Sequence, residues 1–120
     1  MRIVIVEDNV RLASTLADGL AEEGHAVEIL VTANAAIDRG RRGDLDVMVL
    51  DLGLPDRDGL DVLRELRVCH TAPPVLVLTA RDGAEARAAA FALGALGYLV
   101  KPFSFADLLA GLAAVTARPA

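Results

Sequence analysis

Five polar side chains, placed at the ends of four short apolar runs, have the residue types that phosphate chemistry needs. They are three carboxylates, one hydroxyl and one ammonium group: Glu7, Asp8, Asp51, Thr79 and Lys101. Gathered in one crevice, these groups would carry an excess of negative charge, which disfavours ionisation unless a cation is bound. All-oxygen ligands of this kind suit Mg²⁺, which typically takes one or two carboxylates and keeps waters and a phosphate oxygen.

Asp51 is the candidate nucleophile of this group. A carboxylate beside Mg²⁺ can attack a phosphoryl donor and form an acyl phosphate, while the metal and Lys101 stabilise the charge on the transferring group. Thr79 could donate its hydroxyl to a phosphoryl oxygen, and the backbone carbonyl of Gly53 is close enough in sequence to join the metal ligands. Each residue alone has an ordinary explanation, such as a helix cap, a turn aspartate or a solvated lysine. Their occurrence after successive apolar runs favours chemistry.

The apolar runs predict the strands that position these groups. They are rich in Val, Ile and Leu and occur at residues 2–6, 26–31, 46–50, 74–78 and 97–100. Runs without polar alternation are typical of strands buried on both faces of a parallel sheet. The segments between them have helical apolar spacing, for example at Leu12, Leu16 and Leu20. We therefore predict an α/β fold, a three-layer αβα sandwich of five βα units, with the polar groups at the carboxyl ends of the strands.

Local signals predict the helix ends. Ser104 with Asp107, and Asp82 with Glu85, have the spacing of capping boxes at two helix starts. Glycines stand where three helices are expected to stop: Gly24, Gly40 and Gly94. A cluster of arginines at 39, 41 and 42 is interpreted as a solvated helix end.

Composition narrows the classes of protein. The 120 residues suit one domain, and 54% hydrophobic with 24% charged residues excludes disorder as the main state. A net charge of −5 and few aromatic residues argue against direct nucleic-acid binding. Cys69 has no intrachain partner, and His25 and His70 lack a second ligand at metal spacing, which argues against zinc and histidine phosphotransfer. No run suits a signal peptide or a membrane span, so we expect a cytoplasmic protein without membrane contact.

Four segments together resemble a CheY-like response-regulator receiver domain of two-component signalling. They are Glu7-Asp8-Asn9, DLGLPDRDG at 51–59, LTARD at 78–82 and YLVKPF at 98–103. The resemblance covers essentially the whole chain, and the sequences of these motifs are most similar to those of the OmpR/PhoB-type transcription-factor branch. It implies a flavodoxin-like sheet in strand order 2-1-3-4-5 with five helices. The receiver domain is expected at residues 1–117, with 118–120 as a tail or the start of a linker.

The resemblance implies a role for each site residue. Asp51 would be the phosphoacceptor and Lys101 would pair with the phosphoryl group, with a cis peptide bond to the following proline. Asp8 would bind Mg²⁺ directly, Glu7 largely through water, and Gly53 through its carbonyl oxygen.

Thr79 and Tyr98 would form the switch pair. On phosphorylation the hydroxyl of Thr79 would move toward the phosphate, Tyr98 would swing inward, and the surface of the fourth helix, fifth strand and fifth helix would change. Gly53 and Arg81 flank the site and should influence hydrolysis of the phosphoryl group.

The partners implied are a sensor histidine kinase, a second copy on activation, and DNA only through an output domain outside this chain. The chain would catalyse only its own phosphorylation and dephosphorylation, and is not expected to be a turnover enzyme. The dimer surface departs from the branch at four positions: Leu96, Gly97, Gly111 and Ala113. Arg87 and Asp107 could retain one charge pair, and an exposed Leu96 favours a more apolar contact.

Three other functions compete with a phosphorylated receiver. A phosphohydrolase with an aspartyl phosphate would want a second acid two residues after the nucleophile, where this sequence has Gly53. A flavodoxin-like cofactor carrier would be repelled by Glu7 and Asp8 in its phosphate loop. A pseudo-receiver that is never phosphorylated and serves as a docking module can be excluded only by phosphorylation chemistry.

Overall fold

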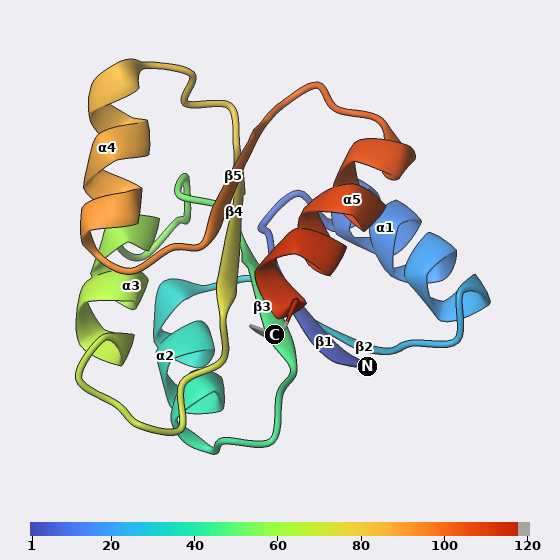
Figure 1. Cartoon of the computed structure of the whole chain (residues 1–120), viewed down its shortest axis with the longest axis horizontal. Coiled ribbons are helices and arrows are strands. Elements are labelled where there is room, and N and C mark those ends of the chain that lie inside the picture. Colours follow the sequence, from blue (N-terminus) through green and yellow to red (C-terminus); the bar gives the residue numbers. More distant parts are fainter. Residues whose placement is uncertain (118–120) are drawn as a thin grey trace.

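The computed structural model describes residues 1–117 and shows strands and helices in strict alternation along the chain (Figure 1). The elements are β1 (Arg2–Val6), α1 (Val10–Glu22), β2 (Ala26–Leu30), α2 (Ala33–Arg41), β3 (Val47–Leu50), α3 (Gly59–Leu66), β4 (Val75–Thr79), α4 (Ala84–Ala92), β5 (Gly97–Val100) and α5 (Phe105–Thr116). The strands are all parallel, in the order β2-β1-β3-β4-β5. The predicted fold class and strand order are confirmed, whereas the predicted tail at 118–120 lies outside the described residues.

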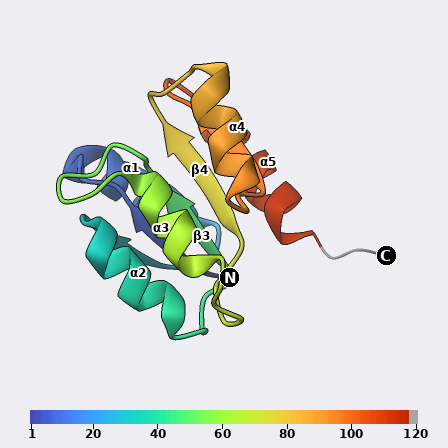
Figure 2. The same ribbon diagram turned by 90° about the vertical axis from the view of Figure 1, so that its left-hand side faces the viewer.

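Two helical layers enclose the sheet. Helices α1 and α5 cover one face, and α2, α3 and α4 cover the other (Figures 1 and 2). Successive side chains of β1 pack against opposite helical layers. Ile3 and Ile5 lie on the side of α1 and α5, and Val4 and Val6 lie on the side of α2, α3 and α4. This double burial explains why the strand sequences lack polar alternation. Within residues 1–117, no helix is long and apolar enough to cross a membrane.

The strand register brings the polar residues to one edge of the sheet. Val6 pairs with Leu50 across β1 and β3, and Thr79 pairs with Val100 across β4 and β5. The Asp51 amide continues the first ladder by donating to the Val6 carbonyl at 2.9 Å. The residues that follow these strands therefore start from neighbouring positions on the carboxyl-end edge of the sheet.

The helix starts confirm one predicted capping box and contradict the other. At α5, Ser104 accepts from the Asp107 amide and the Asp107 carboxylate accepts from the Ser104 amide. The predicted box of Asp82 with Glu85 is wrong, because α4 begins after Gly83 and has no side-chain cap. With Gly83 as the N-cap, Glu85 stands one residue too early to be the partner that a box requires.

The glycine predictions are right at two positions and wrong at one. Gly24 and Gly94 have φ of 90° and 103°, the left-handed geometry that ends a helix. Gly40 does not end α2, which continues to Arg41. A Cβ at Gly40 would lie 2.7 Å from the Leu66 side chain, so this glycine instead permits close packing of α2 against α3.

Arg39 corrects the prediction of a solvated arginine cluster. Its side chain is only 5% exposed and forms ion pairs with Glu28 of β2 and with Asp44, which precedes β3. Two guanidinium nitrogens donate to Glu28 at 2.8 Å each. These contacts hold the pKa of Glu28 and that of Asp44 below their usual values and raise the pKa of Arg39. The triad therefore ties the edge strand β2 to α2 and to the loop before β3.

Replacing Arg39 with Met is expected to lower the midpoint of urea unfolding at pH 7. Both carboxyl pKa values are lowered in the folded state, so their contribution to stability is present above the unfolded pKa of about 4 and is lost as the pH falls through the lower folded values. The difference between wild type and variant should therefore narrow below about pH 4. Arg67→Met is the matched control, since Arg67 is exposed and has no ion pair within residues 1–117. A constant difference from pH 7 to pH 3 would contradict this electrostatic explanation.

Candidate functional site

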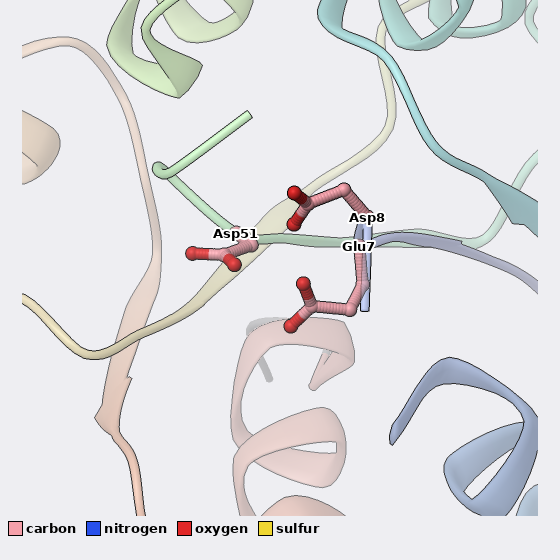
Figure 3. A group of neighbouring side chains, drawn as sticks. All are labelled: Glu7, Asp8 and Asp51. Carbon is pink, nitrogen blue, oxygen red and sulfur yellow. The ribbon is translucent and has the colours of Figure 1, made fainter. Parts of the chain in front are cut away.

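Three carboxyl groups converge at the edge of the sheet. Glu7, Asp8 and Asp51 each offer an oxygen atom, and these atoms all lie within 4.8 Å of one another. Figure 3 shows the three side chains turned toward a shared space, with Asp8 and Glu7 entering from the end of β1 and Asp51 from the end of β3. Glu7 and Asp51 are buried, whereas Asp8 is exposed. Among residues 1–117 this is the one group of acidic, His or Cys side chains with the spacing of a metal site.

Backbone hydrogen bonds orient the two buried carboxylates. The Asn9 amide donates to Glu7 Oε2 at 3.2 Å, and the Gly53 amide donates to Asp51 Oδ1 at 3.1 Å. Asn9 in turn caps α1 by accepting from the Leu12 amide at 3.1 Å. In both cases the backbone amide two residues further along the chain fixes the carboxylate.

Lys101 supplies the cation of the site. Its ammonium group donates to Asp51 Oδ2 at 3.0 Å and also donates to Glu7 Oε1. The Lys101 amide donates to the Thr79 carbonyl at 2.9 Å, which extends the pairing of β4 with β5. The peptide bond from Lys101 to Pro102 is cis, as predicted. The structure therefore brings together Lys101 and the acids that the sequence separates by up to 94 positions.

Burial and hydrogen bonding act in opposite directions on the two buried carboxyls. Burial raises the pKa of Glu7, and the hydrogen bond from Lys101 only partly offsets it. Burial also acts to raise the pKa of Asp51, but hydrogen bonds, including those from the Gly53 amide and Lys101, outweigh it and hold this pKa below its usual value. For Lys101, contact with both carboxylates outweighs burial and raises the pKa of the ammonium group. The Gly53 amide and Lys101 thus favour the ionised form of Asp51, which is the form that a nucleophile needs.

Thr79 and Tyr98 lie on neighbouring strands next to this site. Thr79 is 1% exposed, and its Oγ1 accepts from the Arg81 amide at 3.3 Å. Tyr98 is 7% exposed, and its hydroxyl donates to the Arg81 carbonyl at 2.7 Å. The structure thus shows the inward orientation of Tyr98, which the resemblance assigned to the phosphorylated protein.

The three residues predicted for a dimer surface have different surroundings within one chain. Leu96 is 59% exposed, as anticipated. Asp107 takes part in the capping box of α5. Arg87 lies over two aromatic rings, with its guanidinium carbon 5.3 Å from the centre of Phe91 and 5.6 Å from that of Tyr98. Within one chain Arg87 therefore contacts Tyr98, a contact that no spacing in the sequence indicates.

Arg81 is the residue whose connections sequence reasoning missed. Its position beside the site was noted, but its guanidinium pairs with Asp58, 23 residues earlier. Neither residue shows a local pattern that predicts this partner, because the contact exists only once β3 and β4 lie side by side. Asp58 is recognisable from sequence only as an N-cap, a role that it fills by accepting from the Leu60 amide at 3.0 Å.

Fold and site together define a doubly wound domain with an acidic and lysine-containing centre at the carboxyl ends of its strands. The family model for the response regulator receiver domain matches residues 3–113. The chain is 43% identical over 118 residues to the response regulator protein PmrA of Pseudomonas aeruginosa, covering 98% of this chain and 53% of that protein. It is 39% identical over 120 residues to the transcriptional regulatory protein CusR of Escherichia coli, covering 100% and 53%.

Solved structures agree with this similarity. The non-phosphorylated HemR receiver domain of Leptospira biflexa has a TM-score of 0.89 and 36% identity, covering 99% of this chain and 98% of that one. The BeF₃-activated N-terminal receiver domain of Klebsiella pneumoniae RstA has a TM-score of 0.89 and 28% identity, covering 98% and 100%.

The chain belongs to the response regulator receiver domain family. It is a CheY-like receiver of the OmpR/PhoB-type branch, as the sequence motifs indicated. It spans about half the length of the curated relatives that it matches.

Proposed function

We propose that this receiver accepts a phosphoryl group on Asp51 from a sensor histidine kinase, in a reaction that depends on Mg²⁺. The observation that carries the proposal is the convergence of three carboxylates with the Lys101 ammonium, which contacts Asp51 Oδ2 at 3.0 Å. Burying two acids with one lysine adds little stability to a fold, because the cost of removing the charges from water offsets their attraction. A purely structural role therefore does not explain this cluster.

The donor set fits Mg²⁺. Carboxylate oxygens of Asp8 and Asp51 would bind the ion, with Glu7 acting largely through water and Gly53 through its carbonyl. When bound, the ion would offset negative charge on the carboxylates and on the phosphoryl oxygens. A solved receiver of 28% identity, from the sensor histidine kinase PA1611 of Pseudomonas aeruginosa, has a magnesium ion coordinated in its active-site cleft, which supports this assignment.

The chain's own groups perform the transfer. One carboxylate oxygen of Asp51 attacks phosphorus, the bond between phosphorus and the donor nitrogen breaks, and the electron pair of that bond leaves with the histidine. Lys101, already beside Asp51, is placed to pair with a phosphoryl oxygen. Gly53 keeps one Asp51 oxygen in place through its amide. The phosphoryl group stays on the chain until hydrolysis, so the domain acts as a switch and not as a turnover enzyme.

An apolar hollow beside the site suits the phosphodonor partner. It has a volume of about 390 Å³ and lies between α1 and the loop after β5. Its lining residues are Leu12, Thr15, Leu16, Lys101, Pro102, Phe103 and Phe105. Because Lys101 lines both the hollow and the acidic site, a kinase seated there would present its phosphohistidine close to Asp51.

The output is a change of surface. Phosphorylation would draw the Thr79 hydroxyl toward the phosphate and favour the inward orientation of Tyr98, which reshapes the face formed by α4, β5 and α5. That face would then form a homodimer, with Arg87, Leu96 and Asp107 as candidate contacts. Control of transcription would pass through an output domain beyond this chain, as the names of its relatives suggest.

Intact mass after incubation with acetyl phosphate and Mg²⁺ tests the chemistry. Wild type is expected to gain one phosphoryl group, and Asp51→Asn to gain none, because the amide is not a comparable nucleophile. A chelator should abolish the adduct. Asp61→Asn is the matched control, since Asp61 lies on α3 and pairs only with Arg57 and Arg64 in the described structure.

Two results would overturn this function. A folded wild type that gains no adduct under any of these conditions would instead be a docking module that never carries phosphate. An adduct that persists in Asp51→Asn would place the acceptor elsewhere.

A further inference from the structure

Arg81 contacts the loop that follows β3 as well as Thr79 and Tyr98. Its guanidinium Nη1 donates to the two carboxylate oxygens of Asp58 at 3.0 Å each, and its Nη2 donates to the Leu52 carbonyl at 3.2 Å. Its backbone carbonyl accepts from the Tyr98 hydroxyl at 2.7 Å, and its amide donates to Thr79 Oγ1 at 3.3 Å. One residue thus contacts the segment after β3, the end of β4 and the middle of β5.

We propose that the Arg81–Asp58 ion pair is a latch that holds Tyr98 in its inward orientation. The side chain of Arg81 fixes the position of its own backbone relative to the loop that carries Asp51, and the Arg81 carbonyl is the acceptor of the tyrosine hydroxyl. Arg81 is therefore a positioning residue that acts through Tyr98. The regulatory meaning of that orientation rests on the proposed switch, but the latch itself requires no phosphoryl group.

The geometry separates this role from ordinary capping. Asp58 caps α3 through Oδ1 and contacts Arg81 through both oxygens. Asp58→Asn keeps an oxygen for the Leu60 amide while removing the charge that Arg81 needs. Arg81→Met removes the guanidinium while keeping the carbonyl that Tyr98 uses. Each change therefore breaks the latch without removing the cap or the acceptor.

Exposure to solvent limits how much the Arg81–Asp58 ion pair can stabilise the inward orientation of Tyr98. The Arg81 side chain is 37% exposed and that of Asp58 46%, and exposed ion pairs contribute modestly. Breaking the pair is expected to raise the ratio of outward to inward Tyr98 by up to about fivefold. Because salt screens exposed charges, NaCl at about 1 M should produce much of the same change in wild type.

Acrylamide quenching of tyrosine fluorescence follows the ratio of outward to inward Tyr98. Tyr98 is the only tyrosine and the chain has no tryptophan, so acrylamide quenching reports the exposure of this ring alone. Both single variants should increase the quenching constant, and the double variant should match Arg81→Met, because Asp58 has no guanidinium to pair with once Arg81 is replaced. In wild type the constant should rise with salt, whereas in Asp58→Asn it should not. Arg64→Met, which breaks an exposed pair on α3, is the control with no expected change.

Unchanged quenching in both variants, or salt dependence that persists in Asp58→Asn, would overturn the latch. If a variant is too unstable to measure, the salt titration of wild type alone decides, since a flat response excludes an ionic latch. Urea midpoints measured in parallel show whether a change in quenching reflects Tyr98 or general unfolding. The assay contains no phosphodonor, so its failure leaves phosphorylation of Asp51 untouched, and failure of phosphorylation leaves the latch standing.

Discussion

Lys101→Met is expected to slow Mg²⁺-dependent phosphorylation of Asp51 by on the order of 10²–10³-fold. In this structure the ammonium group lies 3.0 Å from Asp51 Oδ2, where it can stabilise charge that develops on the transferring phosphoryl group. Removing one such preorganised donor commonly costs this much in rate. The rate of adduct formation with acetyl phosphate, followed by intact mass at saturating Mg²⁺, measures the effect.

The same substitution should strengthen Mg²⁺ binding. Lys101 now contacts Glu7 and Asp51, so it competes with a second cation for their negative charge. Calorimetric titration should therefore show a lower dissociation constant for Mg²⁺ in Lys101→Met than in wild type. Slower phosphorylation with weaker Mg²⁺ binding would contradict this view and would indicate that the substitution simply disrupts the site.

Gly59→Ala is expected to damage both stability and phosphorylation. A Cβ at this position would lie 2.5 Å from the Leu52 Cα and 2.6 Å from the Asp51 carbonyl oxygen, and both of these are backbone atoms that cannot rotate away. The Gly59 amide also donates to the Leu52 carbonyl at 2.8 Å. Forcing the start of α3 away from this loop should cost about 1–3 kcal/mol of unfolding free energy. Displacing Asp51 by about 1 Å should slow phosphorylation by roughly 100-fold.

Gly83→Ser is the matched control for this prediction. It also places a larger side chain at a helix start, but nothing lies within 4 Å of the added Cβ. Its hydroxyl can cap α4, which now has no side-chain cap, so stability should be equal or higher. Urea unfolding and the phosphorylation rate are measured for both variants. Equal behaviour of the two would show that the contact beneath Gly59 is unimportant.

The strands and the acidic centre could be predicted because their causes are local. Burial on both faces leaves a run such as Ile3 to Val6 without polar residues, and the next residue then falls at the strand's carboxyl end. Glu7 and Asp51 were therefore placed correctly before any contact between them was known. The strand order came from the resemblance, since apolar runs alone do not say which strands are neighbours.

Two of the errors, at Gly40 and Arg39, arose where the cause is a contact between distant segments, whereas the wrong capping box was a local error in where α4 begins. Gly40 has the appearance of a helix stop, but its function is set by Leu66 on another helix. Arg39 appeared solvated because its partners Glu28 and Asp44 lie on different elements. The latch between Arg81 and Asp58 was invisible for the same reason. The role of such a residue can be predicted only when the topology is known, because the topology determines which distant residues it contacts.

The direction of the strands has a practical consequence for building a sensor from this domain. β1 leaves Met1 at the edge of the sheet opposite the acidic centre, and α5 returns to that same edge, where Val115 lies beside Gly97 at the start of β5 (Figure 1). A fluorescent partner or a surface tether joined directly to Ala117 would therefore start at the edge of the sheet opposite Asp51. The amino end is the poorer attachment point, because the Met1 amine contacts His25 Nδ1 at 2.9 Å and a fusion there would remove that charge.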